Sequence, residues 1–294
     1  MRRGLCTRRG LLQSLALLAT FGAACTQTER TAASRPALPD IILATTTSTQ
    51  DTGLLDVLIP VFRRATGYRV KTIAVGSGQA LELGRRGEAD VLLVHAPEEE
   101  RRFMEDGRGL ARLLVMYNDF VIVGPPDDPA HLRGAASTVE ALARIAGAQA
   151  VWVSRGDQSG THLLERRLWE QAGVVPQGAP WYIESGTAML ASLLIADQKR
   201  AYTLADRGTW LAGRSRLDLV IVFEGAPELR NVYHTIPVAP LPGRRINTEG
   251  AWAWAQYLLS AEAQQLIGSF GRERYSESLF VPAAGLSEEQ ILGG

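Results

Sequence analysis

Four segments of the chain combine hydroxyl side chains with glycine or further hydroxyls, and each lies between a short apolar run and a stretch with helical spacing. They are residues 45–48 (TTTS), 76–78 (GSG), 154–161 (SRGDQSGT) and 185–187 (SGT). The first N–H groups of a helix lack partners and carry partial positive charge, and hydroxyls add further donors. For any single segment, helix capping is the simpler interpretation. Four such segments together favour a shared anionic ligand.

The third segment, which follows the apolar run 150–153, also contains Arg155. A guanidinium offers a planar fork of donors that suits an oxyanion. The competing interpretation is an ion pair with Asp157 or with Asp206. Since a carboxylate cannot favourably face a dianion, we interpret Asp206 as orienting Arg or hydroxyl groups. Arg207 is either a ligand or part of an ion pair that closes two lobes.

Enzyme motifs are missing from the sequence. It has no HExxH or CxxC pair, no Gly-x-Ser-x-Gly elbow, no phosphate loop with Lys and no dinucleotide fingerprint. We interpret His95 and His162, which adjoin the segments, as capping or surface residues. We expect no cofactor, no metal and no enzymatic activity. A secreted hydrolase that uses Ser159 or Ser77 is the alternative from a different functional class.

The elements that would position these segments alternate between strand and helix. Residues 41–44, 68–75 and 91–94 are apolar or alternating runs that predict strands, and helical patterns follow them. This alternation predicts an α/β fold with a mainly parallel sheet, in which ligands bind beyond the carboxyl ends of the strands. A long extended segment, 115–123, precedes a second series of the same kind. The sequence therefore predicts two α/β lobes.

We place lobe I at residues 40–122 plus 237–294 and lobe II at residues 123–236, with crossings near 120–124 and 235–238. The chain is long enough, at 294 residues, to bury two moderate cores. Its formal net charge of zero gives no indication of nucleic-acid binding. Its two cysteines, Cys6 and Cys25, both precede the predicted lobes, so no disulfide is expected within them.

Residues 1–25 have the pattern of a signal peptide: a basic start, a short apolar run and a small-residue end. The segment 7–12 (TRRGLL) is similar to a twin-arginine export signal. Gly-Ala-Ala-Cys resembles a lipobox, which would make Cys25 a lipidation site; cleavage near Ala24 is the alternative. Residues 26–39 are polar with Pro and Ala, as in a tether.

Several longer motifs carry a resemblance to a known family. They are residues 44–55 (ATTTSTQDTGLL), 75–81 (VGSGQAL), 90–97 (DVLLVHAP), 116–125 (MYNDFVIVGP), 154–162 (SRGDQSGTH) and 201–209 (AYTLADRGT). Taken together, they resemble the substrate-binding proteins of tungstate ABC transporters over roughly residues 41–282. The resemblance implies a type II periplasmic-binding-protein fold, with two lobes and a ligand in the cleft between them.

The resemblance also implies a periplasmic or extracytoplasmic protein, with an ABC permease and its ATPase as partners and at most a lipid anchor in the membrane. We expect a monomer that binds tungstate. Molybdate, sulfate or phosphate on the same fold, and a sensor without transport, stay open as alternatives. The expected ligand-binding residues are shared between the lobes: Thr46, Thr47, Ser48, Ser77 and Gly78 from one, and Arg155, Ser159, Gly160, Thr161 and Thr187 from the other.

Overall fold

The computed structural model describes residues 36–293. The predicted signal peptide (1–25), the lipidation site Cys25 and all but the last residues of the predicted tether (26–39) lie outside this range. In the part of the chain that is described, no helix is both long enough and apolar enough to cross a membrane.

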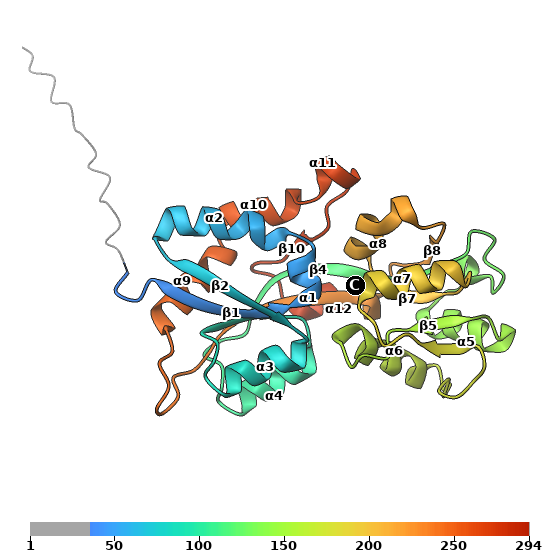
Figure 1. Ribbon diagram of the computed structural model, residues 1–294, viewed down its shortest axis with the longest axis horizontal. Helices are drawn as coiled ribbons and strands as arrows, with labels where there is room; N and C mark the ends of the chain where they lie inside the picture. Colours follow the sequence, from blue (N-terminus) through green and yellow to red (C-terminus); the bar gives the residue numbers. More distant parts are fainter. Residues whose placement is uncertain (1–35, 294) are drawn as a thin grey trace, which may run out of the picture. The chain divides into compact units, whose positions relative to one another are not determined.

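The first group of elements follows the predicted strand–helix alternation. In chain order it comprises β1 (Asp40–Thr46), α1 (Thr47–Asp51), α2 (Leu54–Thr66), β2 (Arg69–Val75), α3 (Ser77–Arg85), β3 (Val91–Val94) and α4 (Pro97–Glu105). The chain returns to this group with α9 (Thr248–Leu258), α10 (Ala261–Ser269), α11 (Arg272–Tyr275), β10 (Val281–Pro282) and α12 (Glu288–Leu292). Helices α3 and α4 lie on one face of the β1–β2–β3 sheet, and α2, α9 and α10 lie on the other (Figure 1).

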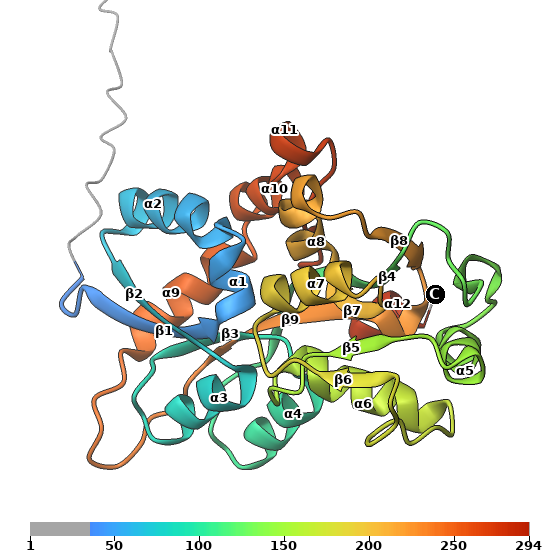
Figure 2. The same cartoon turned by 45° about the vertical axis from the view of Figure 1, so that its right-hand side comes forward.

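The second group lies between the two halves of the first in the sequence. Its elements are the 3₁₀ turn η1 (Leu132–Gly134), α5 (Thr138–Ala148), β5 (Trp152–Ser154), α6 (Gly160–Gln171), β6 (Tyr182–Glu184), α7 (Met189–Gln198), β7 (Thr203–Asp206), α8 (Arg207–Gly213), the turn η2 (Arg214–Arg216), β8 (Val220–Phe223) and the turn η3 (Pro227–Leu229). Figure 2 shows α7 and α8 beside β7, with α5 and α6 near β5 and β6. Strands β5 and β6 form a separate parallel pair.

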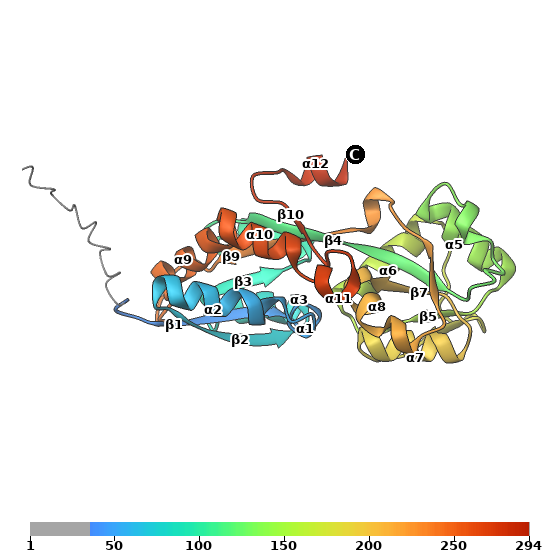
Figure 3. The same cartoon turned by 90° about the horizontal axis from the view of Figure 1, so that it is seen from above.

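Two long strands connect the groups. Strand β4 (Leu113–Gly124) pairs with β9 (Arg230–Pro237) through Asp119, and from Phe120 onward it pairs with β7 and β8 (Figure 3). All these pairings are antiparallel, whereas β1 pairs in parallel with β2 and β3. The prediction of a mainly parallel sheet is therefore wrong around β4 and β9, because these strands run in opposite directions as crossovers between the lobes.

Separate hydrophobic cores accompany the two groups. Leu54, Leu55, Leu58 and Phe62 of α2 recur at helical spacing and pack with Trp254 in the first group. In the second group Trp152, Trp169 and Tyr202 are among the side chains that pack together. Helix α2 includes Pro60 without ending there. The cores agree with two lobes in an α/β fold.

The predicted limits of the lobes stay a prediction. Strand β9 already pairs with β4 and β3 from Arg230 to Pro237, in the first group. We propose that the return crossing lies before Arg230, earlier than residues 235–238.

Candidate functional site

A small cavity lies where the predicted donor-rich segments of the two lobes meet. It is lined by Thr46, Thr47, Ser48, Val75, Gly76, Ser77 and His95 from one lobe, and by Arg155, Ser159, Gly160 and Thr161 from the other. The lining therefore includes every predicted ligand-binding residue except Gly78 and Thr187. The cavity is small, with a volume of about 20 Å³.

The lobe I wall is built from the carboxyl ends of parallel strands. Thr46 is the last residue of β1 and caps α1, because its hydroxyl accepts the N–H of Thr49 at 3.2 Å. Ser77 follows β2 and opens α3, with Gly76 as an N-cap that offers no side chain. The side chain of Ser77 is 5% exposed, and among residues 36–293 no atom pairs with its Oγ. A buried hydroxyl without a partner is costly, so its presence beside a cavity points to a polar ligand.

The lobe II wall is the loop after β5 together with the start of α6. Ser159 caps α6 by accepting the N–H of His162 at 3.4 Å, and Gly160 and Thr161 form the first turn. Arg155 is only 7% exposed; its guanidinium pairs with Asp157, and its Nε donates to the carbonyl of Thr187 at 3.4 Å. The sequence left two roles for Arg155 open, an ion pair with Asp157 and a contact with the ligand. The ion pair is present, and the same side chain also lines the cavity.

Asp157 organises this loop. Its Oδ1 accepts the hydroxyl of Ser159 at 2.6 Å and the N–H of Ser159 at 3.2 Å. Burial opposes ionisation, but the bonds from Ser159 and the charge of Arg155 together lower the pKa of Asp157. The carboxylate is therefore ionised at neutral pH, and it fixes a cation and a hydroxyl at the edge of the cavity.

Two of the predicted ligands lie outside the cavity lining. Gly78 is the second residue of α3, and Thr187 directs its hydroxyl to Ser185 at 3.2 Å and to Ser192 at 3.1 Å. Thr187 reaches the site only through its carbonyl, which accepts from Arg155. Neither Gly78 nor the side chain of Thr187 lines the cavity, so their roles as ligands stay predictions.

Asp206 and Arg207 have other partners. Asp206 caps α8, and its Oδ1 accepts the N–H and the hydroxyl of Thr209 at 2.8 and 2.9 Å. It therefore orients a hydroxyl, as expected, rather than an arginine. Arg207 pairs with Glu224, and its Nη1 lies 3.9 Å from Glu277 of the C-terminal segment. This arrangement agrees with an ion pair between the lobes and not with a ligand.

Sequence reasoning missed His95, which it assigned to capping or the surface. The residue directly follows β3 and is 8% exposed, and its imidazole lines the cavity. Burial lowers the pKa of His95 to about 4, and the positive charge of Arg155 lowers it further. The charge of Glu100 and the hydrogen bond to Asn231 raise the pKa but do not offset the burial. The signal was its position at the carboxyl end of a buried strand, which it shares with the other site loops.

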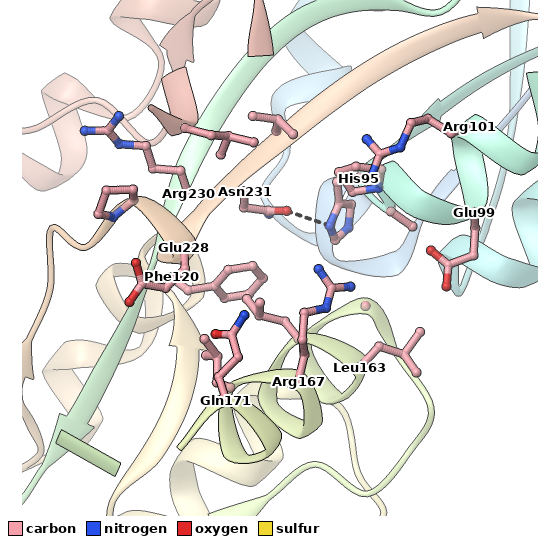
Figure 4. A pocket seen from close by; sticks show the side chains of 18 residues that line it. His95, Glu99, Arg101, Phe120, Leu163, Arg167, Gln171, Glu228, Arg230 and Asn231 are labelled. Atoms are coloured by element: carbon pink, nitrogen blue, oxygen red, sulfur yellow. Dashed lines mark hydrogen bonds between the residues drawn. The ribbon is translucent and has the colours of Figure 1, made fainter. Parts of the chain in front are cut away.

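His95 and Gly160 also line a second cavity of about 380 Å³ beside the first. Figure 4 shows His95 bonded to Asn231 at the border of this space, with Arg167 approaching from α6. Within residues 36–293 no three His, Cys, Asp or Glu side chains are grouped to hold a metal ion. Hydroxyls, one guanidinium and backbone donors suit a small oxyanion.

Comparison with known proteins identifies the family. Residues 25–262 match the model of the PBP superfamily domain. The tungstate-binding protein TupA of Peptoclostridium acidaminophilum is 47% identical over 272 residues, which cover 92% of this chain and 95% of that protein. The chain belongs to the TupA family of this superfamily.

Two solved structures are similar to this chain in both sequence and fold. The tungstate-binding protein TupA from Desulfovibrio alaskensis G20 is 42% identical, with a TM-score of 0.76 over 84% of this chain and 99% of that one. A tungstate ABC transporter structure from Geobacter sulfurreducens is 45% identical, with a TM-score of 0.70 over 79% of this chain and 98% of that one. The two-lobed periplasmic-binding-protein fold predicted from the sequence is confirmed.

Proposed function

We propose that this protein is the extracytoplasmic substrate-binding component of an ABC importer, and that it binds tungstate in the cavity between Ser77 and Arg155. The observation that carries the proposal is the buried hydroxyl of Ser77, which has no partner among the described residues and faces a cavity with Arg155 opposite. An oxyanion supplies the missing acceptor. The names and titles of the relatives supply the choice of tungstate.

The site would hold the dianion with few full charges. Thr46, Thr47, Ser48 and Ser77 offer hydroxyls from lobe I, and Ser159, Gly160 and Thr161 offer donors at the start of α6. Only Arg155 brings a formal positive charge into the lining, which otherwise contains neutral groups. Since donors come from both lobes, a bound anion would stabilise the closed arrangement, which the permease could recognise.

Export and anchoring belong to the same proposal. Residues 1–25 would direct export, Cys25 would carry a lipid, and residues 26–39 would tether the lobes to the membrane surface. Globomycin blocks the lipoprotein signal peptidase, so treatment of an expressing culture should make a larger, uncleaved precursor accumulate if Cys25 is lipidated, and this globomycin-dependent shift should be absent from Cys25→Ala. A wild-type protein whose size does not respond to globomycin would contradict the anchor.

Isothermal titration with tungstate, molybdate, sulfate and phosphate tests the function. We expect one tungstate per chain and tighter binding of tungstate than of sulfate or phosphate. Tighter binding of phosphate or sulfate than of tungstate would contradict the ligand while leaving an oxyanion-binding role. Absence of heat and of thermal stabilisation with all four anions would contradict the proposal as a whole.

A further inference from the structure

The hydrogen bonds around His95 fix one tautomer of its neutral imidazole. The Nδ2 group of Asn231 donates to Oδ1 of Asn118 and to the hydroxyl of Tyr233, both at 2.9 Å. The carbonyl oxygen of Asn231 therefore faces His95, whose Nδ1 lies 3.0 Å away. Since that oxygen only accepts, Nδ1 of His95 carries the proton.

The other ring nitrogen then competes with the ligand for a proton. In the neutral imidazole, Nε2 is an acceptor, and it lies 3.2 Å from Oγ1 of Thr46 and 3.5 Å from Oγ of Ser48. A hydroxyl has a single proton to donate. While His95 is neutral, its Nε2 competes with an anion for the proton of Ser48 or for that of Thr46, whose Oγ1 also lies 2.7 Å from Oγ1 of Thr49.

The surroundings of His95 make its charge sensitive to an anion in the cavity. The carboxylate of Glu100 favours the imidazolium form, and Arg155 disfavours it. The ring of Tyr233, whose own pKa is raised by burial, packs at 4.7 Å from the imidazole. The adjoining cavity also presents charged side chains of both signs from α4, α6, η3 and the start of β9: Glu99, Arg101, Arg167, Glu228 and Arg230.

We propose that His95 is a positioning residue that takes up one proton when the oxyanion binds, and so releases a hydroxyl proton of Thr46 or Ser48 to the anion. The proton comes from solvent and bonds to Nε2. The hydroxyl that donated to Nε2 now accepts from it and turns its own proton to an oxygen of the anion. No other bond forms or breaks, and the anion's negative charge stabilises the imidazolium.

This inference rests on the proposed function and has a thermodynamic signature. Burial keeps the pKa of His95 near 4 in the free protein, and a dianion next to the ring raises it. At a pH between the pKa of His95 in the free protein and its pKa in the complex, binding takes up a proton. The affinity for the anion therefore increases as pH falls, by up to about tenfold per pH unit. A His95 that acted only by packing would leave affinity insensitive to protonation at this ring.

Calorimetric titration of the full chain with tungstate near pH 7, in two buffers of contrasting ionisation enthalpy and without oxyanions, counts the protons. We expect uptake of up to about one proton per tungstate in the wild type. We expect uptake near zero in His95→Gln, whose amide does not titrate, and unchanged uptake in His131→Asn, which alters an exposed histidine. Protonation of tungstate itself would register equally in all three proteins.

Nitrogen NMR of the wild type provides a second readout that does not depend on a variant folding. Nε2 of His95 should change from the unprotonated to the protonated state when tungstate is added. Tungstate binding with no proton uptake, or with His95 neutral in the complex, would overturn this inference and leave the proposed function intact. Absence of tungstate binding by the wild type would instead defeat the proposed function.

Discussion

Arg155 and Asp157 form an ion pair within a single loop, and the same carboxylate holds Ser159 at the start of α6. The side chains of Arg155 and Asp157 are 9% and 21% exposed, and their pairing holds the guanidinium at the cavity before a ligand arrives. A charge fixed in advance loses little side-chain entropy on binding. The arrangement also means that an anion must share Arg155 with the carboxylate of Asp157.

Reversing the charge of Arg155 should abolish tungstate binding. Arg155→Glu removes the only formal cation in the lining and places a carboxylate at the anion, so we expect affinity to fall by at least about 100-fold. Arg166→Glu is the matched control, because it makes the same change at an exposed position of α6. Equal tungstate affinities for R155E and the wild type, by calorimetry, would remove Arg155 from the site.

Removing the hydroxyl of Ser77 should weaken binding without weakening the fold. Ser77→Ala deletes a donor to a charged ligand, which is worth about 10- to 100-fold in affinity. Because the hydroxyl has no partner among the described residues, the unfolding free energy of the free protein should not decrease. Thr138→Val is the control, since Oγ1 of Thr138 is also buried and unpartnered but lies at the start of α5. Only S77A should lose tungstate affinity.

Glu165 should make stability fall as pH rises. It lies under the Arg155 loop and accepts from Trp152, Ser154 and Tyr182 at 2.8–2.9 Å, yet burial raises its pKa from 4.5 to about 7. Between these values the folded chain holds a proton that the unfolded chain has lost. The fold therefore loses stability as pH rises through this window, by an amount on the order of 3 kcal/mol.

Glu165→Gln tests this, because an amide does not titrate: its oxygen can accept from Trp152 and Tyr182, and its NH2 group can donate to the hydroxyl of Ser154. Urea unfolding at pH 4.5 and pH 8 should show the wild type losing more free energy of unfolding than the variant. A parallel change in the two proteins would mean that Glu165 does not titrate in this range.

Arg112 should be important for stability. It donates to Glu100, which is fully buried, at 2.8 Å and to Glu288 of α12 at 2.6 Å. Arg112→Met would leave the carboxylate of Glu100 without this partner, which costs about 3–5 kcal/mol when a buried pair is broken. Arg101→Met, which removes a half-exposed partner of Glu288, should cost at most about 1 kcal/mol. Equal chemical denaturation midpoints for the two variants would contradict this ranking.

Local sequence patterns predicted the elements that carry the site. Thr46, Ser77 and Ser159 each lie at the start of a helix that follows a strand. The sequence pattern of an apolar or alternating run, small polar residues and helical spacing is visible without a structure. The grouping of these residues across two lobes followed from the rule that ligands lie at the carboxyl ends of strands. The resemblance to a known family supplied the choice of ligand.

Long-range pairing set the limits of prediction. The bond between His95 and Asn231 joins residues far apart in sequence, and nothing local indicates it. Whether the crossover strands pair in parallel or antiparallel depends on which strands β4 meets. The sequence does not show this, so the prediction of a mainly parallel sheet was wrong around β4 and β9. Thr187 illustrates the same limit, because its hydroxyl faces Ser185 and Ser192 rather than the cavity that its segment suggested.

The most direct test of the central claim is the position of tungsten in a crystal of the protein grown with tungstate. Anomalous diffraction at a tungsten absorption edge should give one strong peak in the cavity, with oxygens within hydrogen-bond distance of Ser77 Oγ and of the Arg155 guanidinium. A peak elsewhere on the chain, with Ser77 and Arg155 making no contact to the anion, would contradict the account.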